Sequence, residues 1–196
     1  VVKPTLENYV AMFRSAGGDW IPFGRYAVNS LFVTLAGTFL HVVVALLAAF
    51  PLAKMKFRGS KVIFKIITYS LLFSGTVTAF PQYILMANFR MIDSYAALIL
   101  PSVATPMGAF LLKNFMIQIP DTIMEAARMD GASNYRTLFQ IVAPNLKPAV
   151  LTLIILVSQG MWNGSNASFV YTEKLKLLPT MLNQIVASGT ARIGVG

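Results

Sequence analysis

The sequence predicts an all-α integral membrane protein, a polytopic helix bundle with about four complete membrane spans and part of a fifth. Composition is the first reason: 56% of the 196 residues are hydrophobic and only 12% are charged, whereas about a quarter of a soluble domain is charged. The second reason is a series of apolar runs long enough to cross a bilayer. The chain begins at Val1 and stops at Gly196 within a small-residue apolar stretch. We therefore expect residues 1–196 to form one transmembrane domain and to be a fragment of a longer protein.

The first predicted span covers residues 28–53. Within it, Leu31 to Ala53 is a run of 23 residues in which His41 is the one ionisable group. A helix of this length measures about 35 Å, enough to cross a hydrocarbon core of about 30 Å. Because polar groups inside a span are costly, His41 makes either a helix-packing hydrogen bond or a proton relay, and we favour packing.

The later apolar runs are interrupted by polar residues or prolines. The second holds Lys65 near one end, where a long side chain can reach the interface, and Pro81 near the other. Pro101 and Pro106 interrupt the third, and the fourth continues through a polar break around Asn163. These runs predict spans at 62–87, 96–118 and 149–171, and an incomplete one at 185–196.

Basic residues set the predicted orientation of the spans. The segment 54–65 carries five basic residues and no acidic one, so the positive-inside rule places it in the cytoplasm. Alternation of the spans then places 113–147 on the same side. Nine basic residues fall on the cytoplasmic side and seven on the other, so the first loop decides the orientation. We expect a multi-pass protein of a plasma (inner) membrane with both loops in the cytoplasm.

Several functional classes lack the residues that they need. The chain has no cysteine, which excludes disulfides and thiolate metal sites, and we expect no metal centre. Its basic residues, which give a net charge of +9, are spread among apolar runs. Single-stranded nucleic acid requires a surface that combines aromatic and basic residues, so we expect no nucleic-acid binding. The apolar runs hold no Asp or Glu, which leaves little for a catalytic pair or a carboxylate-coupled carrier. We expect no catalytic residues, and a secondary transporter or channel is the alternative function.

A polar insert interrupts this apolar chain at 120–147. Asp121 follows a proline and favours a helix start as its N-cap, and Gly131 fits the left-handed position that ends a helix. Ser133 can cap a second helix. The apolar stripe of that helix consists of Tyr135, Leu138, Phe139 and Val142. We therefore expect two short helices joined at a sharp angle.

The first helix of the insert carries features suited to recognition. Ala126 and Ala127 would give it a small-residue face that another backbone can approach, and Glu125, Arg128 and Asp130 supply charges around that face. The insert is either a surface loop lying on its own membrane domain or a docking element for a cytoplasmic partner.

The spacing within the insert resembles a known family pattern. The run Glu125-Ala126-Ala127, followed by Gly131, Ile141 and Pro144, falls at the positions of E-A-A-x3-G-x9-I-x-L-P, the EAA loop of binding-protein-dependent ABC importer permeases. The departure is Ala143, where the pattern has Leu, which weakens packing of the second helix. Other stretches resemble the carbohydrate-uptake group of the maltose and multiple-sugar type, namely Asn29–Leu31, Lys56–Gly59, Tyr95–Pro101, Lys147–Ala149 and Ser158–Asn163. The resemblance covers residues 24 to 196.

The resemblance implies a type I ABC importer permease with a non-catalytic role in bacterial carbohydrate import. Its partners would be a cytoplasmic ABC ATPase dimer that binds ATP and Mg, a second permease subunit forming a heterodimer, and an external sugar-binding protein; this chain would hold no cofactor. The chain has no G-x-x-x-x-G-K-[ST] phosphate loop, in agreement with ATP chemistry on another chain. The implied ATPase-coupling residues are Glu125, Ala126, Ala127, Arg128, Asp130, Gly131, Ala132, Ile141 and Pro144.

Polar and aromatic residues near the span ends are candidates for the substrate path. Polar groups that face a cavity in a membrane are costly and often functional, and aromatic rings can stack on sugar faces. The alternative is an interfacial belt of aromatic residues with polar span ends. The candidates are Gln82, Tyr83, Gln159, Trp162, Asn163 and Asn166.

Overall fold

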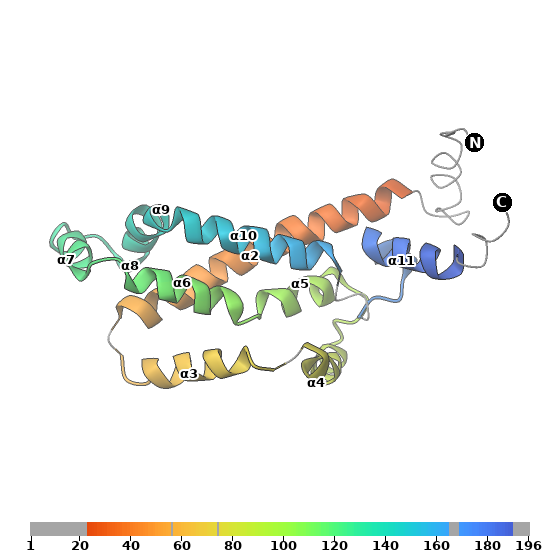
Figure 1. The fold of residues 1–196 in the computed structure, drawn as a ribbon, viewed down its shortest axis with the longest axis horizontal. Coiled ribbons are helices and arrows are strands. Elements are labelled where there is room, and N and C mark those ends of the chain that lie inside the picture. Colours follow the sequence, from red (N-terminus) through yellow and green to blue (C-terminus); the bar gives the residue numbers. More distant parts are fainter. Residues whose placement is uncertain (1–22, 56, 74, 165–168, 190–196) are drawn as a thin grey trace, which may run out of the picture.

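The computed structural model describes residues 23–55, 57–73, 75–164 and 169–189, and every regular element within these ranges is helical. Figure 1 shows an elongated bundle in which the start of the first described helix and the last described helix lie toward the same end of the molecule. The elements, in chain order, are α2 (Phe23–Lys54), α3 (Ser60–Ser70), α4 (Gly75–Asn88), α5 (Tyr95–Val103), α6 (Met107–Ile117), α7 (Asp121–Met129), α8 (Asn134–Arg136), the π-helix η1 (Thr137–Val142), α9 (Ala143–Asn145), α10 (Lys147–Trp162), the 3₁₀-helix η3 (Glu173–Leu175) and α11 (Leu178–Gly189).

Helix α2 is the central element of the bundle. It has 32 residues and packs along α6, α10 and α5. Ala49 and Phe50 of α2 are buried in one core cluster with Leu112 of α6 and Leu153 of α10. The same cluster continues into the insert through Met124. The core therefore joins the polar insert to the apolar bundle.

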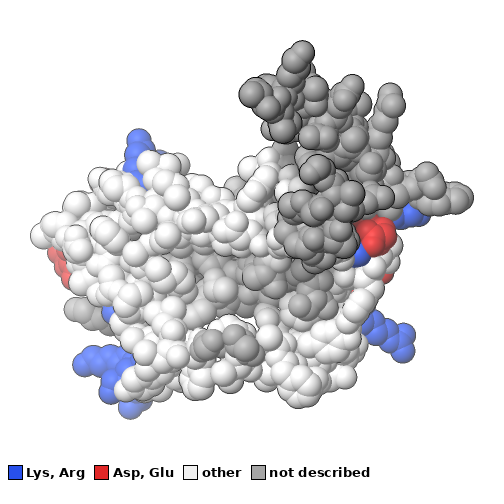
Figure 2. All heavy atoms as spheres, turned by 45° about the vertical axis from the view of Figure 1, so that its right-hand side comes forward, with Lys and Arg blue, Asp and Glu red and all other residues white. Residues whose placement is uncertain are grey.

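Two helical stretches of the described residues are long and apolar enough to cross a membrane, Gly24–Lys54 and Tyr95–Ile117. A third span results if Asn134–Asn145 and Lys147–Trp162, which meet at 84°, count as one broken span. The first two stretches overlap the ranges 28–53 and 96–118 in which spans were expected. Charged side chains on the face in Figure 2 lie toward the two ends of the molecule, and the described surface between them is uncharged.

The second apolar run differs from the expected single helix at 62–87. It forms α3 and α4, which are separated between Ser70 and Gly75. The Thr68 and Ser70 hydroxyls donate to helix carbonyls, at 2.8 and 2.7 Å, and such side-chain bonds compete with the helix ladder. Leu71 N then donates to the carbonyl three residues back, at 3.3 Å, which tightens and ends the last turn. Polar side chains in an apolar run therefore explain the break.

The fourth apolar run is also shorter as a helix than the expected 149–171. Helix α10 ends at Trp162, where Asn163 N donates to the Gln159 carbonyl at 3.1 Å and Gly164 has φ +71°. The polar break thus ends the helix instead of interrupting it. Helix α11 begins at Leu178, before the expected start at 185.

Candidate functional site

The insert lies at one end of the bundle, where α7 stands beyond the ends of α2 and α6 (Figure 1). Its helix-break-helix form agrees with the prediction. Gly131 has φ +71°, the left-handed conformation expected for the residue that ends α7. Ser133 Oγ accepts a hydrogen bond from Arg136 N at 3.3 Å and so caps the second helix, as predicted.

The start of α7 corrects one sequence prediction. Pro120 is the N-cap, and Asp121 is the first helical residue. Its carboxylate accepts a hydrogen bond from Lys54 Nζ at 2.8 Å, and the same Nζ donates to the Ile119 carbonyl at 2.5 Å. The Lys54 side chain is 4% exposed and that of Asp121 is 72% exposed. Lys54, the last residue of α2, therefore anchors the start of α7 to the central helix.

Sequence reasoning counted Lys54 only as one charge in a basic loop. Lys54 and Asp121 are 67 positions apart, and no motif or periodicity pairs them. The available signals were an acidic residue in the first turn of a predicted helix and a basic residue at the end of a predicted span. Neither identifies the other as its partner.

Helix α7 has a buried face and an exposed face. Met124 and Ala127 are buried, and Met124 belongs to the core cluster of the bundle. Glu125 and Ala126 are exposed, as are Arg128, Asp130 and Gly131, and Met129 is 89% exposed. Because successive helical residues point in different directions, Ala126 and Ala127 do not share the small-residue face that the sequence suggested. Ala126 lies on the outer face, and Ala127 packs inward.

The second half of the insert is a π-helix, η1, in place of the expected α-helix. Leu138 and Val142 are buried, whereas Tyr135 and Phe139 are exposed, so half of the predicted apolar stripe faces outward. In an α-helix the ring of Pro144 would crowd the carbonyl four residues before it, and proline has no N–H to donate. A wider π turn just before it relieves that crowding.

The remaining coupling candidates differ in exposure. Ala132 and Ile141 are half-buried, and Pro144 is exposed. Ala143, which departs from the family pattern, is half-buried and packs against the core cluster that contains Leu138 and Val142. The smaller residue therefore still contributes to the interface between the second half of the insert and the bundle.

His41 lies buried where α2 meets α5 and α6. Its Nδ1 is 2.9 Å from the carbonyl oxygen of Ser102. A Cβ at Gly108 would lie 2.3 Å from His41 Nε2, so the missing side chain of Gly108 makes room for the imidazole. This geometry is that of a helix-packing hydrogen bond, the role favoured from the sequence.

The substrate-path candidates fall into two groups. Gln82 and Tyr83 are half-buried on α4, and the Tyr83 hydroxyl is 3.0 Å from that of Tyr171. The second group is exposed at the end of α10, namely Gln159, Trp162 and Asn163. Asn166 lies outside the described residues. Among the described residues, no hydrogen bond or ring contact joins the two groups.

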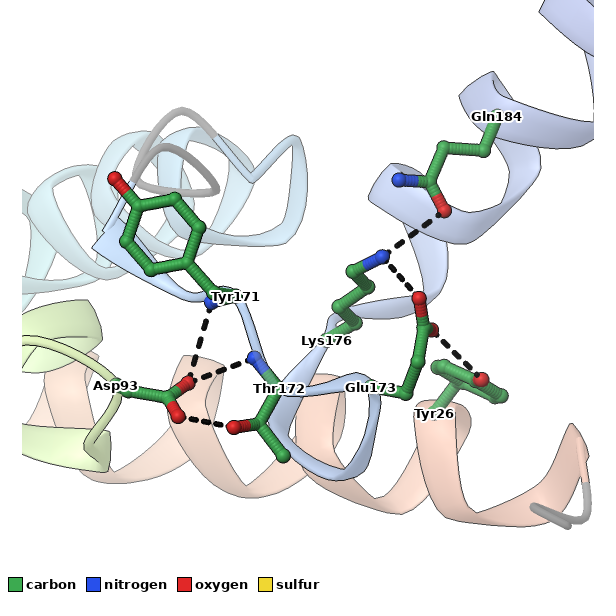
Figure 3. A network of polar contacts seen from close by, with 7 residues as sticks. All are labelled: Tyr26, Asp93, Tyr171, Thr172, Glu173, Lys176 and Gln184. Atoms are coloured by element: carbon green, nitrogen blue, oxygen red, sulfur yellow. Dashed lines mark hydrogen bonds and ion pairs between the residues drawn. The ribbon is translucent and has the colours of Figure 1, made fainter.

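A polar network at the opposite end from α7 was not predicted (Figure 3). Asp93 has φ +61°, and its carboxylate accepts hydrogen bonds from Tyr171 N at 3.2 Å and from Thr172 N at 2.9 Å. The Thr172 hydroxyl also donates to it. These hydrogen bonds lower the pKa of Asp93 below its ordinary value of 3.8, and the bond from the Thr172 hydroxyl has the largest effect.

The same segment is tied to the start of α2. The Asn29 side chain donates to the Lys174 carbonyl at 2.8 Å, and Ser30 Oγ accepts a hydrogen bond from Leu178 N at 2.7 Å. Glu173 accepts a hydrogen bond from the Tyr26 hydroxyl at 3.3 Å and pairs with Lys176 (Figure 3). The resemblance of Asn29–Leu31 to the carbohydrate-uptake group was one sequence signal at this end.

Apolar helices long enough to cross a membrane, and a two-faced helical insert docked at one end, form the architecture expected of a membrane transport subunit. The chain belongs to the family described as binding-protein-dependent transport system inner membrane component, whose model matches residues 21–172. It is accordingly a multi-pass inner-membrane protein and a non-catalytic component of its system. The all-helical fold and the permease family inferred from the insert are confirmed.

Individual relatives and a solved structure agree with this family. The chain is 32% identical over 167 residues to protein LplC of Bacillus subtilis, covering 85% of this chain and 54% of that protein. It is 28% identical to the arabinooligosaccharides transport system permease protein AraQ of Halalkalibacterium halodurans, covering 81% and 56%. It is 32% identical to the sn-glycerol-3-phosphate transport system permease protein UgpE of Pectobacterium atrosepticum, covering 92% and 60%.

The crystal structure of a bacterial ABC transporter involved in the import of the acidic polysaccharide alginate contains a similar chain. Its TM-score is 0.79 at 25% identity, covering 85% of this chain and 59% of that one. The chain thus spans between about half and three fifths of the length of these relatives.

Proposed function

We propose that this chain is a permease subunit of an ATP-driven, binding-protein-dependent system for uptake of a carbohydrate, in particular an oligosaccharide. It forms half of the translocation pathway, beside a second permease subunit, and receives substrate from an extracytoplasmic binding protein. The names of two relatives support the substrate class, because AraQ is named for arabinooligosaccharides and the alginate structure for a polysaccharide. UgpE is named for sn-glycerol-3-phosphate, which is the competing substrate.

The observation that carries this proposal is the two-faced helix α7. Met124 packs in the core cluster of the bundle, while Ala126 and Met129 are exposed. This outer face, with a small residue beside an exposed methionine, fits a cleft on another protein. We assign that cleft to a cytoplasmic ATPase dimer, which binds ATP and Mg.

The Lys54 anchor gives this contact a mechanical consequence. Because Lys54 binds both Ile119 and Asp121, a force that moves α7 also acts on the end of α2. Closure of the ATPase dimer would therefore move the helix against which α5, α6 and α10 pack. This is the step that alternates access to the pathway.

Copurification tests the coupling role. The complete chain is purified from mild-detergent membranes as wild type, as Ala126→Arg on the outer face of α7, and as the control Asn145→Arg on α9, where the side chain is also exposed. The wild type and the control should retain an ATPase and a second permease, and Ala126→Arg should lose the ATPase. A wild-type chain that purifies alone would instead indicate a carrier or channel.

A transport assay tests the substrate class separately. Reconstituted vesicles or cells should accumulate a labelled oligosaccharide in an ATP-dependent manner and in competition with unlabelled oligosaccharides. Uptake of glycerol-3-phosphate alone would retain the coupling mechanism and reject the oligosaccharide.

A further inference from the structure

A pocket of about 560 Å³ opens at the cytoplasmic end of the bundle, away from the insert's outer face. It lies between the end of α2, the turn that leads to α3, the first turns of α3 and the end of α6. Its volume falls in the range of roughly 300–1,000 Å³ that is typical of small-molecule sites. It belongs to neither the coupling face nor the candidate substrate path.

The lining of this pocket combines cations with apolar side chains. Arg58, Lys61 and Lys113 contribute the charges, no Asp or Glu is among the lining residues, and Leu52 and Phe57 contribute apolar surface. A group of three like charges repels itself unless an anion lies among them. The pocket therefore has the chemistry of a site for an anion that carries apolar groups.

Lys113 is held in place by neighbouring rings. Its Nζ lies 3.4 Å from the centre of the Phe64 ring, and Phe64 stacks on Phe110 with ring centres 5.8 Å apart. The ring face attracts the ammonium, which restricts the direction of the side chain. The cation at the α6 side of the pocket is thus preorganised rather than free to swing into solvent.

Helix α3 leads from the pocket along an apolar surface. It has no buried residue, and Val62 and Ile66, one turn apart, are each about 60% exposed. The basic segment beside it places this end at the cytoplasmic leaflet, whose anionic lipids attract basic residues close to the membrane. An acyl chain along α3 would cover Val62 and Ile66 while its headgroup reaches the cations.

We propose that this pocket binds an anionic glycerophospholipid, with the phosphate among Arg58, Lys61 and Lys113 and an acyl chain along the exposed face of α3. The lipid fills the gap between α3 and the bundle and holds α3 in position. A neighbouring protein helix is the less suitable occupant, because it would have to bring carboxylates to three cations at the lipid boundary, where carboxylates are costly.

The test compares two variants that each remove two cytoplasmic charges. Lys61→Gln/Lys113→Gln removes two cations of the pocket, and Lys65→Gln/Lys147→Gln removes two exposed cations outside it. The complete chain is reconstituted with spin-labelled phosphatidylglycerol, and with spin-labelled phosphatidylcholine as the zwitterionic reference. Removal of two pocket charges should weaken the preference for phosphatidylglycerol by about 25-fold, at roughly five-fold per charge. The control pair should weaken it several-fold less.

A second measurement on the wild-type chain does not depend on how the variants fold. Photoreactive phosphatidylglycerol should label the stretch 55–64, and excess inorganic phosphate should not displace it. The proposal is overturned if the two double variants lose the same preference for phosphatidylglycerol, or if the photoreactive lipid labels another part of the chain. It is also overturned if phosphate displaces the lipid, or if this stretch cross-links to another protein instead of lipid.

Discussion

The turn at Gly131 allows a prediction whose magnitude follows from the structure. Gly131 has φ +71°, Gly131 N donates to the Arg128 carbonyl at 3.0 Å, and Ala132 N donates to the Ala127 carbonyl at 2.9 Å. This is the Schellman arrangement that ends many helices. A Cβ added to Gly131 would meet nothing within 4 Å. The cost that the added Cβ brings is therefore conformational, with no contribution from collision.

The structure thus predicts a graded series at this position. Gly131→Asn should cost little, because Asn tolerates the left-handed conformation. Gly131→Ala should cost about 1 kcal/mol, and Gly131→Val about 2 kcal/mol, because a β-branched side chain is least compatible with positive φ. All three variants should insert normally into the membrane, because Gly131 lies in the polar insert and not in an apolar span.

Hydrogen exchange at the Ala132 amide measures this cost directly, because that amide donates the bond that closes the turn. Exchange should quicken about five-fold in Gly131→Ala and about thirty-fold in Gly131→Val, because its rate depends exponentially on the free energy of opening. ATPase copurification and uptake should fall in the same order. If Asn is as damaging as Val, or if Val changes nothing, positive φ is not the reason for glycine here.

Three further outcomes follow from the geometry. Replacing Lys54 by Met removes two charged hydrogen bonds and should destabilise the docking of α7 by about 1–3 kcal/mol. Faster hydrogen exchange of the α7 amides would measure this loss. The swap Lys54→Asp/Asp121→Lys should restore little of the stability, because the Ile119 carbonyl then loses its donor. Gly108→Ala would place a Cβ 2.3 Å from His41 Nε2, and this overpacking should cost about 1–3 kcal/mol in thermal stability, less in a His41→Ala background. The pKa of Asp93 is lowered in the folded protein, so its carboxylate stabilises the docking of the segment after α10 above pH 3.8. Hydrogen-exchange protection of that segment should disappear only as the pH falls below 3.8. Asp93→Asn should remove this dependence on pH. A flat profile in the wild type would contradict this assignment.

Local patterns made the insert predictable from sequence. Gly131 and Ser133 act within a few residues of their own positions, so helix-end and capping rules find them. The first span was equally accessible, because a long apolar run with a single ionisable group leaves few alternatives. The EAA spacing then identified the family.

Features that depend on distant or competing interactions were not predictable. The Lys54–Asp121 pair joins helices 67 positions apart, and the Asp93 network joins a loop to a segment 79 positions later. The break after Ser70 was hidden because hydropathy does not register hydroxyls that bond to their own helix. Likewise, helical periodicity assumed an α-helix at 137–142, where the structure has a π-helix before Pro144.

Helix α2 is fastened at both of its ends, through Asn29 and Ser30 at one and Lys54 at the other. A 32-residue helix is about 48 Å long, so it acts as a lever. A tilt of only about 10° about one end would displace the other by roughly 8 Å at this length. A small rotation imposed at the cytoplasmic anchor would therefore shift the segment after α10 sideways by more than the width of a side chain. The two ends of the bundle would then be linked through a single helix, whose one internal proline, Pro51, lies in its last turn beside the Lys54 anchor.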